Sequence, residues 1–180
     1  MTSLHIGPAT LRLLQGDLAV QDVDAIVNAA NSSLMGGGGV DGALHRAGGI
    51  TNLKACKEWT SQYGPLPPGK ALITPGGNLK ARFVIHAVGP VYDASPAVSE
   101  ILASAYRESL RLAEEKRLES IAFPSISTGA YGYPLLEAAP VALRAITDHL
   151  RKESRLTEVR MVLFDDRALS AYRKALETLR

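Results

Sequence analysis

The residues best suited to chemistry lie together in residues 28–46, which hold Asn31, Asp41 and four consecutive glycines at 36–39. Glycine lacks a Cβ, so its backbone N–H groups can approach a ligand closely and the chain can adopt positive φ angles. A glycine run that opens a helix also presents unpaired N–H donors and the positive end of the helix dipole to an anion. We interpret this stretch as a loop that holds a diphosphate and places Asn31 and Asp41 against a sugar.

Two common glycine motifs do not fit this stretch. A nucleotide P-loop needs Lys-Ser/Thr after its last glycine, where this chain has Val40 and Asp41. A dinucleotide fingerprint needs spaced glycines, whereas residues 36–39 are contiguous. The remaining alternative is a flexible surface turn. The position of the run between an apolar strand (25–27) and a helix (40–47) favours a binding loop instead.

Two further loops follow predicted strands. Residues 124–133 contain two glycines and follow the apolar segment 120–123, and Phe164 ends the apolar segment 159–164. In open α/β sheets, ligands bind beyond the carboxyl ends of the strands. We therefore expect these loops and the first one to converge on one cleft.

The elements that position these loops alternate along the chain. Strands are expected at residues 6–14, 25–27, 70–74, 82–88, 120–123 and 159–164. Helices are expected at residues 40–47, 51–63 and 95–116. A further helix ends near residue 150, and residues 165–166 cap the last one. Pro140 leaves the start of the helix that ends near residue 150 open, because proline suits only the first turn. This alternation indicates one α/β domain, residues 1–180, with helices on both faces of a sheet.

Composition narrows the class of protein. The chain has 180 residues, 46% of them hydrophobic, which suffices for a proper core. Its 20 basic and 18 acidic residues give no electrostatic argument for binding nucleic acid. The single cysteine, Cys56, excludes an internal disulfide and a cysteine-rich zinc site. With no secretion signal and no apolar run of membrane-spanning length, we expect a cytoplasmic monomer without a membrane partner.

Together these segments resemble the macro domain family, and closely its MacroD-type branch. The segments that carry the resemblance, in family order, are 16–18, 24–31, 36–46, 84–90 and 123–134. The resemblance implies a three-layer α/β/α sandwich with a mixed central sheet that binds ADP-ribose. For MacroD-type members it also implies hydrolysis of ADP-ribose esters, either on Asp or Glu side chains of proteins or in O-acetyl-ADP-ribose, without a metal or other cofactor.

The resemblance assigns residues to the adenine and the diphosphate. Asp17 would accept from the adenine amine, with the Leu18 amide nearby, and Phe164 would lie against the adenine face. The alternatives are a turn role for Asp17 and core packing for Phe164. The residues whose backbone amides would hold the diphosphate are Gly38, Gly39, Val40, Ser127, Thr128, Gly129, Ala130 and Tyr131.

The resemblance places the chemistry at the distal ribose. Asn31 would bond the ribose hydroxyls, Asp41 would position or polarise a water, and Tyr131 would lie over the sugar. Whether Asp41 is the general base stays open, because an ordinary aspartate, with a pKa of about 3.9, is a weak base at neutral pH. The alternative for Asp41 is the N-cap of a helix that begins at Gly42.

Three other candidates receive structural interpretations. His45, one helical turn after Asp41, is expected to pack against it or against the first loop. His86 is expected to be a core histidine with its polar atoms satisfied, and Cys56 to be inert.

The sequence therefore predicts a mono-ADP-ribosyl hydrolase and O-acetyl-ADP-ribose deacetylase, with Asp41 and Asn31 as its catalytic residues. Its partners would be ADP-ribose, O-acetyl-ADP-ribose and mono-ADP-ribosylated proteins. The alternative from another class is a reader module that binds ADP-ribose without turnover. A binder of RNA or poly(ADP-ribose) is a weaker alternative, for which the charge balance gives no support.

Overall fold

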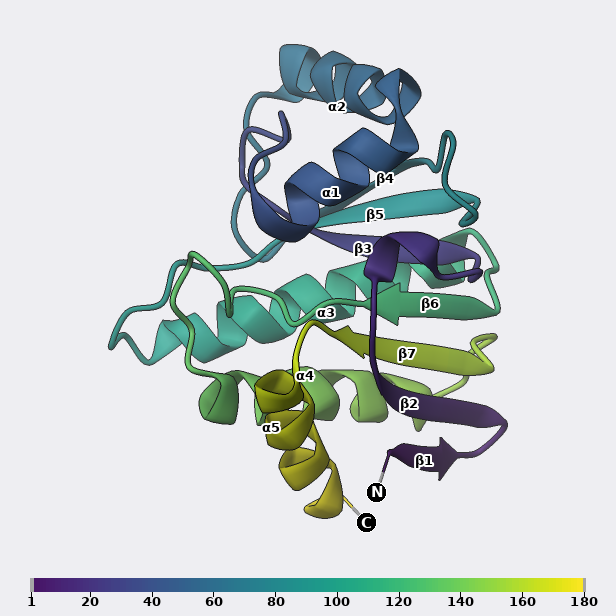
Figure 1. Ribbon diagram of the computed structural model, residues 1–180, viewed down its shortest axis with the longest axis vertical. Coiled ribbons are helices and arrows are strands. Elements are labelled where there is room, and N and C mark those ends of the chain that lie inside the picture. The colour runs from purple at the N-terminus through teal and green to yellow at the C-terminus, as the bar shows by residue number, and fades with distance from the viewer. Residues whose placement is uncertain (1, 180) are drawn as a thin grey trace.

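The computed structural model describes residues 2–179, apart from the side chain of Val40. The strands are β1 (Ser3–Ile6), β2 (Ala9–Gln15), β3 (Ala25–Ala30), β4 (Ala71–Pro75), β5 (Phe83–Val88), β6 (Ser120–Phe123) and β7 (Glu158–Leu163) (Figure 1). The helices are α1 (Gly39–Gly48), α2 (Ile50–Tyr63), α3 (Ala97–Glu115), α4 (Leu135–Leu150), α5 (Asp166–Glu177) and a short 3-10 helix, η1 (Leu18–Val20). No helix in this described part of the chain has the length and apolar character needed to cross a membrane.

The strands form one sheet in the order β1-β2-β7-β6-β3-β5-β4. The five inner strands, from β2 to β5, run parallel to one another. The two edge strands are antiparallel to their neighbours, β1 to β2 and β4 to β5. The sheet is therefore mixed, as the resemblance implied.

Helices cover both faces of the sheet, because the inner strands are apolar on both sides. Alternate residues of β6 divide between the two faces: Ile121 and Phe123 pack in the larger core with α3, α4 and α5, whereas Ala122 packs in a smaller cluster with Leu18 of η1 and Leu44 of α1. Figure 1 shows α3 and α4 behind the sheet and α1 in front of it. The predicted three-layer α/β/α sandwich is confirmed.

The structure differs from the expected elements at the first strand and at the strand that precedes the glycine loop, and it decides the start of the helix that contains Pro140. The segment expected as one strand at 6–14 is a hairpin of β1 and β2, which turns at Gly7 with a φ of 57°. β3 continues to Ala30 because it pairs with β5 along its whole length. Pro140 lies inside α4, which begins at Leu135. Its missing N–H leaves the carbonyl of Leu136 without its helical partner, and Leu136 is exposed, so water can serve instead.

Candidate active site

The loops that leave the carboxyl ends of the parallel strands gather at one edge of the sheet, on the left of Figure 1. They comprise residues 16–17 after β2, 31–38 after β3, 89–96 after β5, 124–134 after β6 and 164–165 after β7. A hydrogen bond of 2.9 Å from the Tyr92 N–H to the Tyr131 carbonyl joins the loops after β5 and β6. Every residue that the sequence analysis assigned to a ligand lies along this edge, where open α/β sheets bind their ligands.

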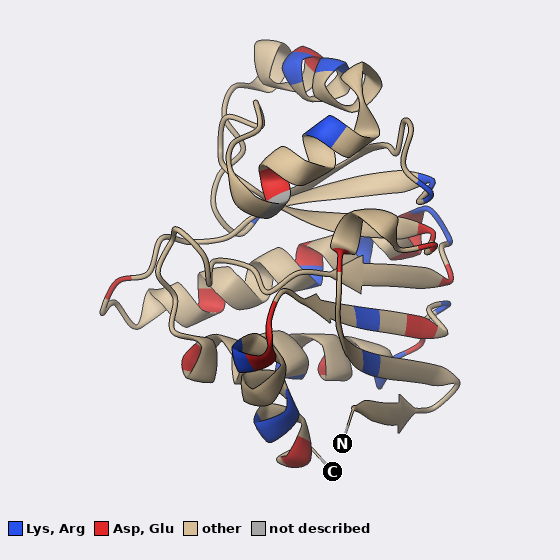
Figure 2. Ribbon diagram, viewed as in Figure 1, with Lys and Arg blue, Asp and Glu red and all other residues tan. Residues whose placement is uncertain are grey.

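The glycine loop ends by opening α1. Gly38 is the N-cap, and no side chain among the described residues caps the helix, so the first-turn N–H groups, including those of Gly39 and Val40, remain available to a ligand. Gly36 and Gly39 have φ angles of 87° and 58°, a backbone region that favours glycine. Residues 31–38 carry no charged side chain (Figure 2), so an anion bound here would be held by backbone N–H groups and the helix dipole.

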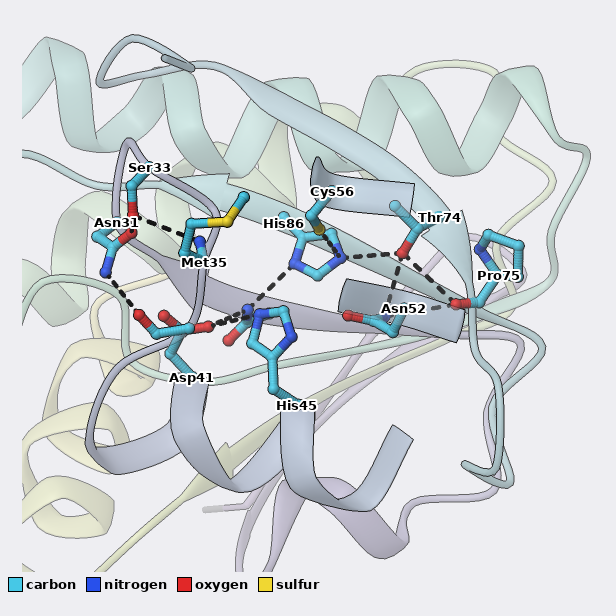
Figure 3. Close-up of polar contacts among 12 residues, drawn as sticks. Asn31, Ser33, Met35, Asp41, His45, Asn52, Cys56, Thr74, Pro75 and His86 are labelled. Carbon is cyan, nitrogen blue, oxygen red and sulfur yellow. Dashed lines mark hydrogen bonds and ion pairs between the residues drawn. The ribbon is translucent and has the colours of Figure 1, made fainter. Parts of the chain in front are cut away.

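Asn31 and Asp41 border the same small space beside Gly37. A Cβ placed on Gly37 would lie 3.5 Å from Asn31 Nδ2 and 3.5 Å from Asp41 Oδ2. Asn31 is held in the loop: its Nδ2 donates to the Gly36 carbonyl at 3.1 Å, and its Oδ1 accepts from Ser33 Oγ at 2.6 Å. The absence of a side chain at Gly37 therefore leaves one amide nitrogen and one carboxylate oxygen facing a common space (Figure 3).

The two carboxylate oxygens of Asp41 have different surroundings. Oδ1 accepts a hydrogen bond of 2.7 Å from Asn28 Nδ2 and lies 3.2 Å from His45 Nε2, whereas Oδ2 is the oxygen beside Gly37. Asp41 is buried, with 6% of its surface exposed. It belongs to the first turn of α1, whose N-cap is Gly38, so the alternative of a helix cap at Asp41 is wrong. Its position leaves Oδ2 free for a ligand or a water.

His45 packs against Asp41 and the first loop, as expected. Its Nε2 is close enough to Asp41 Oδ1 for an ion pair if the ring is protonated, without the geometry of a hydrogen bond. On its other side the ring carbon Cδ2 would lie 3.4 Å from a Cβ at Gly36. The ring also stacks on His86, with centroids 5.7 Å apart. His45 thus closes the inner wall of the site.

The second loop is strained at Ser127, which has a φ of 68° although it is not glycine. Its Oγ is buried and has no hydrogen-bond partner among the described residues. A Cβ placed on Gly89 would lie 2.1 Å from this Oγ, so the loop can lie here only because residue 89 is glycine. The loop is otherwise well anchored, since the Ile126 N–H donates to Tyr106 Oη at 2.9 Å. Strained backbone of this kind is common at ligand sites. Thr128, Gly129, Ala130 and Tyr131 follow in the same uncharged loop (Figure 2).

Asp17 and Phe164 follow the neighbouring strands β2 and β7. A hydrogen bond from the Gly16 N–H to the Leu163 carbonyl joins the ends of these strands. Asp17 Oδ1 accepts from the Ala19 N–H at 2.9 Å and so caps η1, the turn role that was the alternative to ligand binding; its second oxygen remains available. Leu18 is buried beneath it. Phe164 is 87% exposed, so core packing is wrong for this residue. Its ring offers a free aromatic face.

Three buried residues near Asp41 received no functional role from the sequence: Asn28 was not singled out, His86 was expected to be a core histidine with its polar atoms satisfied, which the structure confirms, and Cys56 was expected to be inert. Asn28 bonds Asp41 directly, His86 bonds Asn28, and Cys56 Sγ lies 3.5 Å from His86 Nε2, although no histidine is near it in the sequence. The signal that could have found them is the register of the sheet, which sets Asn28 of β3 beside His86 of β5. In the described part of the chain, no group of three or more metal-ligating side chains is placed to hold a metal ion.

The fold and the site define an α/β/α protein whose ligand edge has two uncharged loops, 31–38 and 124–134, and one buried carboxylate at its end. The chain belongs to the macro domain family, whose model, described as Macro domain, matches residues 27–142. It is 54% identical over 170 residues to a macro domain-containing protein of Caldanaerobacter subterraneus subsp. tengcongensis, covering 94% of this chain and 97% of the relative. It is 50% identical over 165 residues to an O-acetyl-ADP-ribose deacetylase of Klebsiella pneumoniae, covering 91% of this chain and 94% of the relative.

Solved structures agree with this membership. The Oceanobacillus iheyensis macrodomain with ADP is 45% identical and superposes with a TM-score of 0.95, over 99% of this chain and 95% of that one. The Trypanosoma brucei macrodomain in complex with ADP-ribose is 37% identical, with a TM-score of 0.84 over 92% of this chain and 68% of that one.

Proposed function

We propose that this protein binds ADP-ribose and hydrolyses its esters, removing acetyl groups from O-acetyl-ADP-ribose and mono-ADP-ribose from acidic side chains of proteins. The name of the Klebsiella relative supports the deacetylase activity. Two solved macrodomains, one with ADP and one in complex with ADP-ribose, support ADP-ribose as the ligand.

The order of the binding groups along the sheet edge supports ADP-ribose as the ligand. Asp17 and Phe164 follow β2 and β7, residues 127–131 follow β6, and Asn31 with Asp41 lies beyond β3. These strands are consecutive in the sheet. Neighbouring strands are about 4.8 Å apart, so the four strand ends span roughly 14 Å. An aromatic end, an anion-binding middle and a polar end in that order suit adenine, diphosphate and distal ribose.

The observation that carries the hydrolase proposal is the free Oδ2 of Asp41 beside Asn31 Nδ2. Asn31 would donate to a ribose hydroxyl, and Oδ2 would accept from a water and orient it toward the acyl carbon. The water oxygen bonds to that carbon, the bond from the carbon to the ribose oxygen breaks, and one water proton ends on the ribose oxygen as the acid leaves. Orientation and electrostatic stabilisation account for much of such a rate enhancement.

The test is Asp41→Asn, which keeps the volume of the side chain and an oxygen for the bond from Asn28. We expect kcat for O-acetyl-ADP-ribose, measured by acetate release without added metal, to fall on the order of 10²-fold or more. The Kd for ADP-ribose, measured by calorimetry, should change little. Label release from a protein mono-ADP-ribosylated on glutamate tests the second activity in the same way.

Asp148→Asn is the matched control, because Asp148 lies on α4 with its side chain 59% exposed. Its activity should equal that of the wild type. Tight ADP-ribose binding by a wild-type protein that releases neither acetate nor label would contradict the hydrolase proposal and support the reader module. A wild-type protein that does not bind ADP-ribose would contradict both.

A further inference from the structure

A chain of buried polar side chains runs from Asp41 across neighbouring strands of the sheet (Figure 3). Asn28 Nδ2 lies 2.7 Å from Asp41 Oδ1 and 3.1 Å from His86 Nδ1. His86 Nε2 lies 2.9 Å from Thr74 Oγ1, which accepts from Asn52 Nδ2 at 3.1 Å. The chain connects α1 to β3, β5, β4 and α2 in turn, and each member is at most 6% exposed. Buried polar groups in such a network strongly constrain one another.

Donor and acceptor requirements fix the orientation of the Asn28 amide and the tautomer of His86. Asn28 Nδ2 has two hydrogens, one for Asp41 Oδ1 and one for His86 Nδ1, so His86 Nδ1 must accept. The ring proton is then on Nε2, where it can be donated to Thr74 Oγ1. Rotating the Asn28 amide by 180° would set its oxygen 2.7 Å from the carboxylate of Asp41, an unfavourable contact between two acceptors.

The orientation of the Asn28 amide is set by the hydrogen bonds of its nitrogen, Nδ2, and not by its oxygen, Oδ1. Asn28 is completely buried, and its Oδ1 has no hydrogen-bond partner among the described residues. An unpartnered buried oxygen is costly. The amide nevertheless keeps this orientation, in which the nitrogen makes two bonds, one of them to His86 Nδ1.

We infer that His86 is a positioning residue for the proposed hydrolysis: its unprotonated Nδ1 orients the Asn28 amide, which holds Asp41 Oδ1 and thereby directs Oδ2 toward Asn31 and the reacting water. The inference rests on the proposed function. His86 touches no part of the ligand edge itself. Its effect should therefore be on turnover, with little effect on ligand binding.

The surroundings keep His86 neutral. Burial lowers the pKa of His86 to about 3, with a smaller contribution in the same direction from His45 and an opposing one from Asp41. The other ionisable group in contact is Cys56, whose thiol has its pKa raised to about 12, first by burial and then by Asp41. Nδ1 thus stays an acceptor over the working pH range, and no proton needs to move along the chain.

Two substitutions test the two ring nitrogens of His86 one at a time. In His86→Asn the new amide oxygen can take the place of Nδ1 and accept from Asn28, while the contact with Thr74 is lost. In His86→Gln the new amide nitrogen can take the place of Nε2, while nothing replaces Nδ1. We expect kcat for O-acetyl-ADP-ribose to fall on the order of 10²-fold in His86→Gln and much less in His86→Asn, since small misplacements of reacting groups have effects of that size.

Two further readouts distinguish positioning from a purely structural role. The KM and the Kd for ADP-ribose should change by less than about threefold in both variants, because binding groups are untouched. The Tm should fall in both. Thr147→Val, which alters a buried hydroxyl on α4, serves as the stability control and should keep the wild-type kcat.

The tautomer can be measured in the wild type without any variant. Long-range ¹H–¹⁵N correlation of protein with ¹⁵N-labelled histidine should show His86 with its proton on Nε2. The His86 signals are assigned as those missing from the spectrum of His86→Asn, or by through-space contacts with Thr74. A proton on Nδ1, equal loss of kcat in the Asn and Gln variants, or wild-type kcat in His86→Gln would each overturn the inference. Failure of the proposed function would look different, since the wild type itself would then release no acetate.

Discussion

The two carboxylate oxygens of Asp41 face different surroundings. Oδ1 is bonded by Asn28 and contacted by His45, so it is committed to the protein interior. Oδ2 borders the space beside Gly37 and is the oxygen left for a ligand. A carboxylate held at one end has few rotamers to lose when a water or sugar binds, and preorganisation of this kind is how electrostatic groups accelerate reactions.

The thiol of Cys56 should be unreactive in the folded protein. Its burial raises the pKa to about 12, and Asp41 adds to the effect, so almost no thiolate forms at pH 8. An aromatic disulfide reagent should therefore show no reaction with native protein over an hour. One equivalent per chain should react in denaturant, which is the control. Rapid labelling of the native protein would contradict the buried thiol.

At the residue scale, the sequence predicted a candidate site but could not rank its members. The motifs around Asn31 and Asp41 are local in the chain, and the structure places both residues beyond the carboxyl end of β3, beside Gly37. The role of Asn28 and His86 depends on a β3–β5 register that joins residues 58 positions apart, which no local pattern reveals. For Phe164 the sequence left ligand binding and core packing equally open, and only its exposure decides against packing.

The element that shapes the site is α1 together with the loop that precedes it. Gly42 of α1 packs directly against that loop: a Cβ here would lie 2.1 Å from the Gly37 carbonyl oxygen. The helix and the loop can therefore pack this closely only because residue 42 has no side chain.

Gly42→Ala should displace the glycine loop and weaken ADP-ribose binding by at least about tenfold. Overpacking of this kind also destabilises, by roughly 1–3 kcal/mol. Calorimetry with ADP-ribose and chemical unfolding measure the two effects. Gly48→Ala, at the other end of α1, is the matched control: its Cβ would meet only ordinary contacts of 3.5–3.6 Å, so binding should be unchanged. Equal Kd values in the two variants would contradict the close packing at Gly42.

The elements themselves were mostly readable from the sequence, since buried parallel strands and amphipathic helices have distinct periodicities. The exceptions have physical reasons. β1 is an edge strand with partly exposed residues, so its pattern is weak. α4 contains Pro140 on its exposed side, where a lost helical hydrogen bond can be replaced by water, so the proline left the start of that helix open in the sequence.

For the molecule as a whole, the buried His86 should make stability depend on pH. Its pKa is lowered from the ordinary 6.5 to about 3, so the unfolded chain binds a proton between these values that the folded protein does not. The stability contribution is complete above pH 6.5 and is lost as the pH falls toward 3. The slope is about 1.4 kcal/mol per pH unit, or roughly 2 kcal/mol between pH 7 and pH 5.

Chemical unfolding at pH 7, 6 and 5 measures this loss, and the range avoids the pH values at which most carboxylates titrate. His86→Asn is the control, because it removes the titrating group; the difference in unfolding free energy between it and the wild type should shrink as the pH falls. A difference that is constant from pH 7 to pH 5 would contradict the neutral buried ring.

The parallel pairing of β2 with β7 limits the order in which parts of the molecule can fold during synthesis. It joins residues 10–15 to residues 158–163, so almost the whole chain lies in the loop that this contact closes. Contacts between such distant segments form slowly in folding. During synthesis, β2 emerges early but must wait for β7. Asp17 and Phe164, which follow these two strands, can therefore come together only when the last strand has been made. A nascent chain would therefore contain Asn31 and Asp41 before Asp17 and Phe164 could come together.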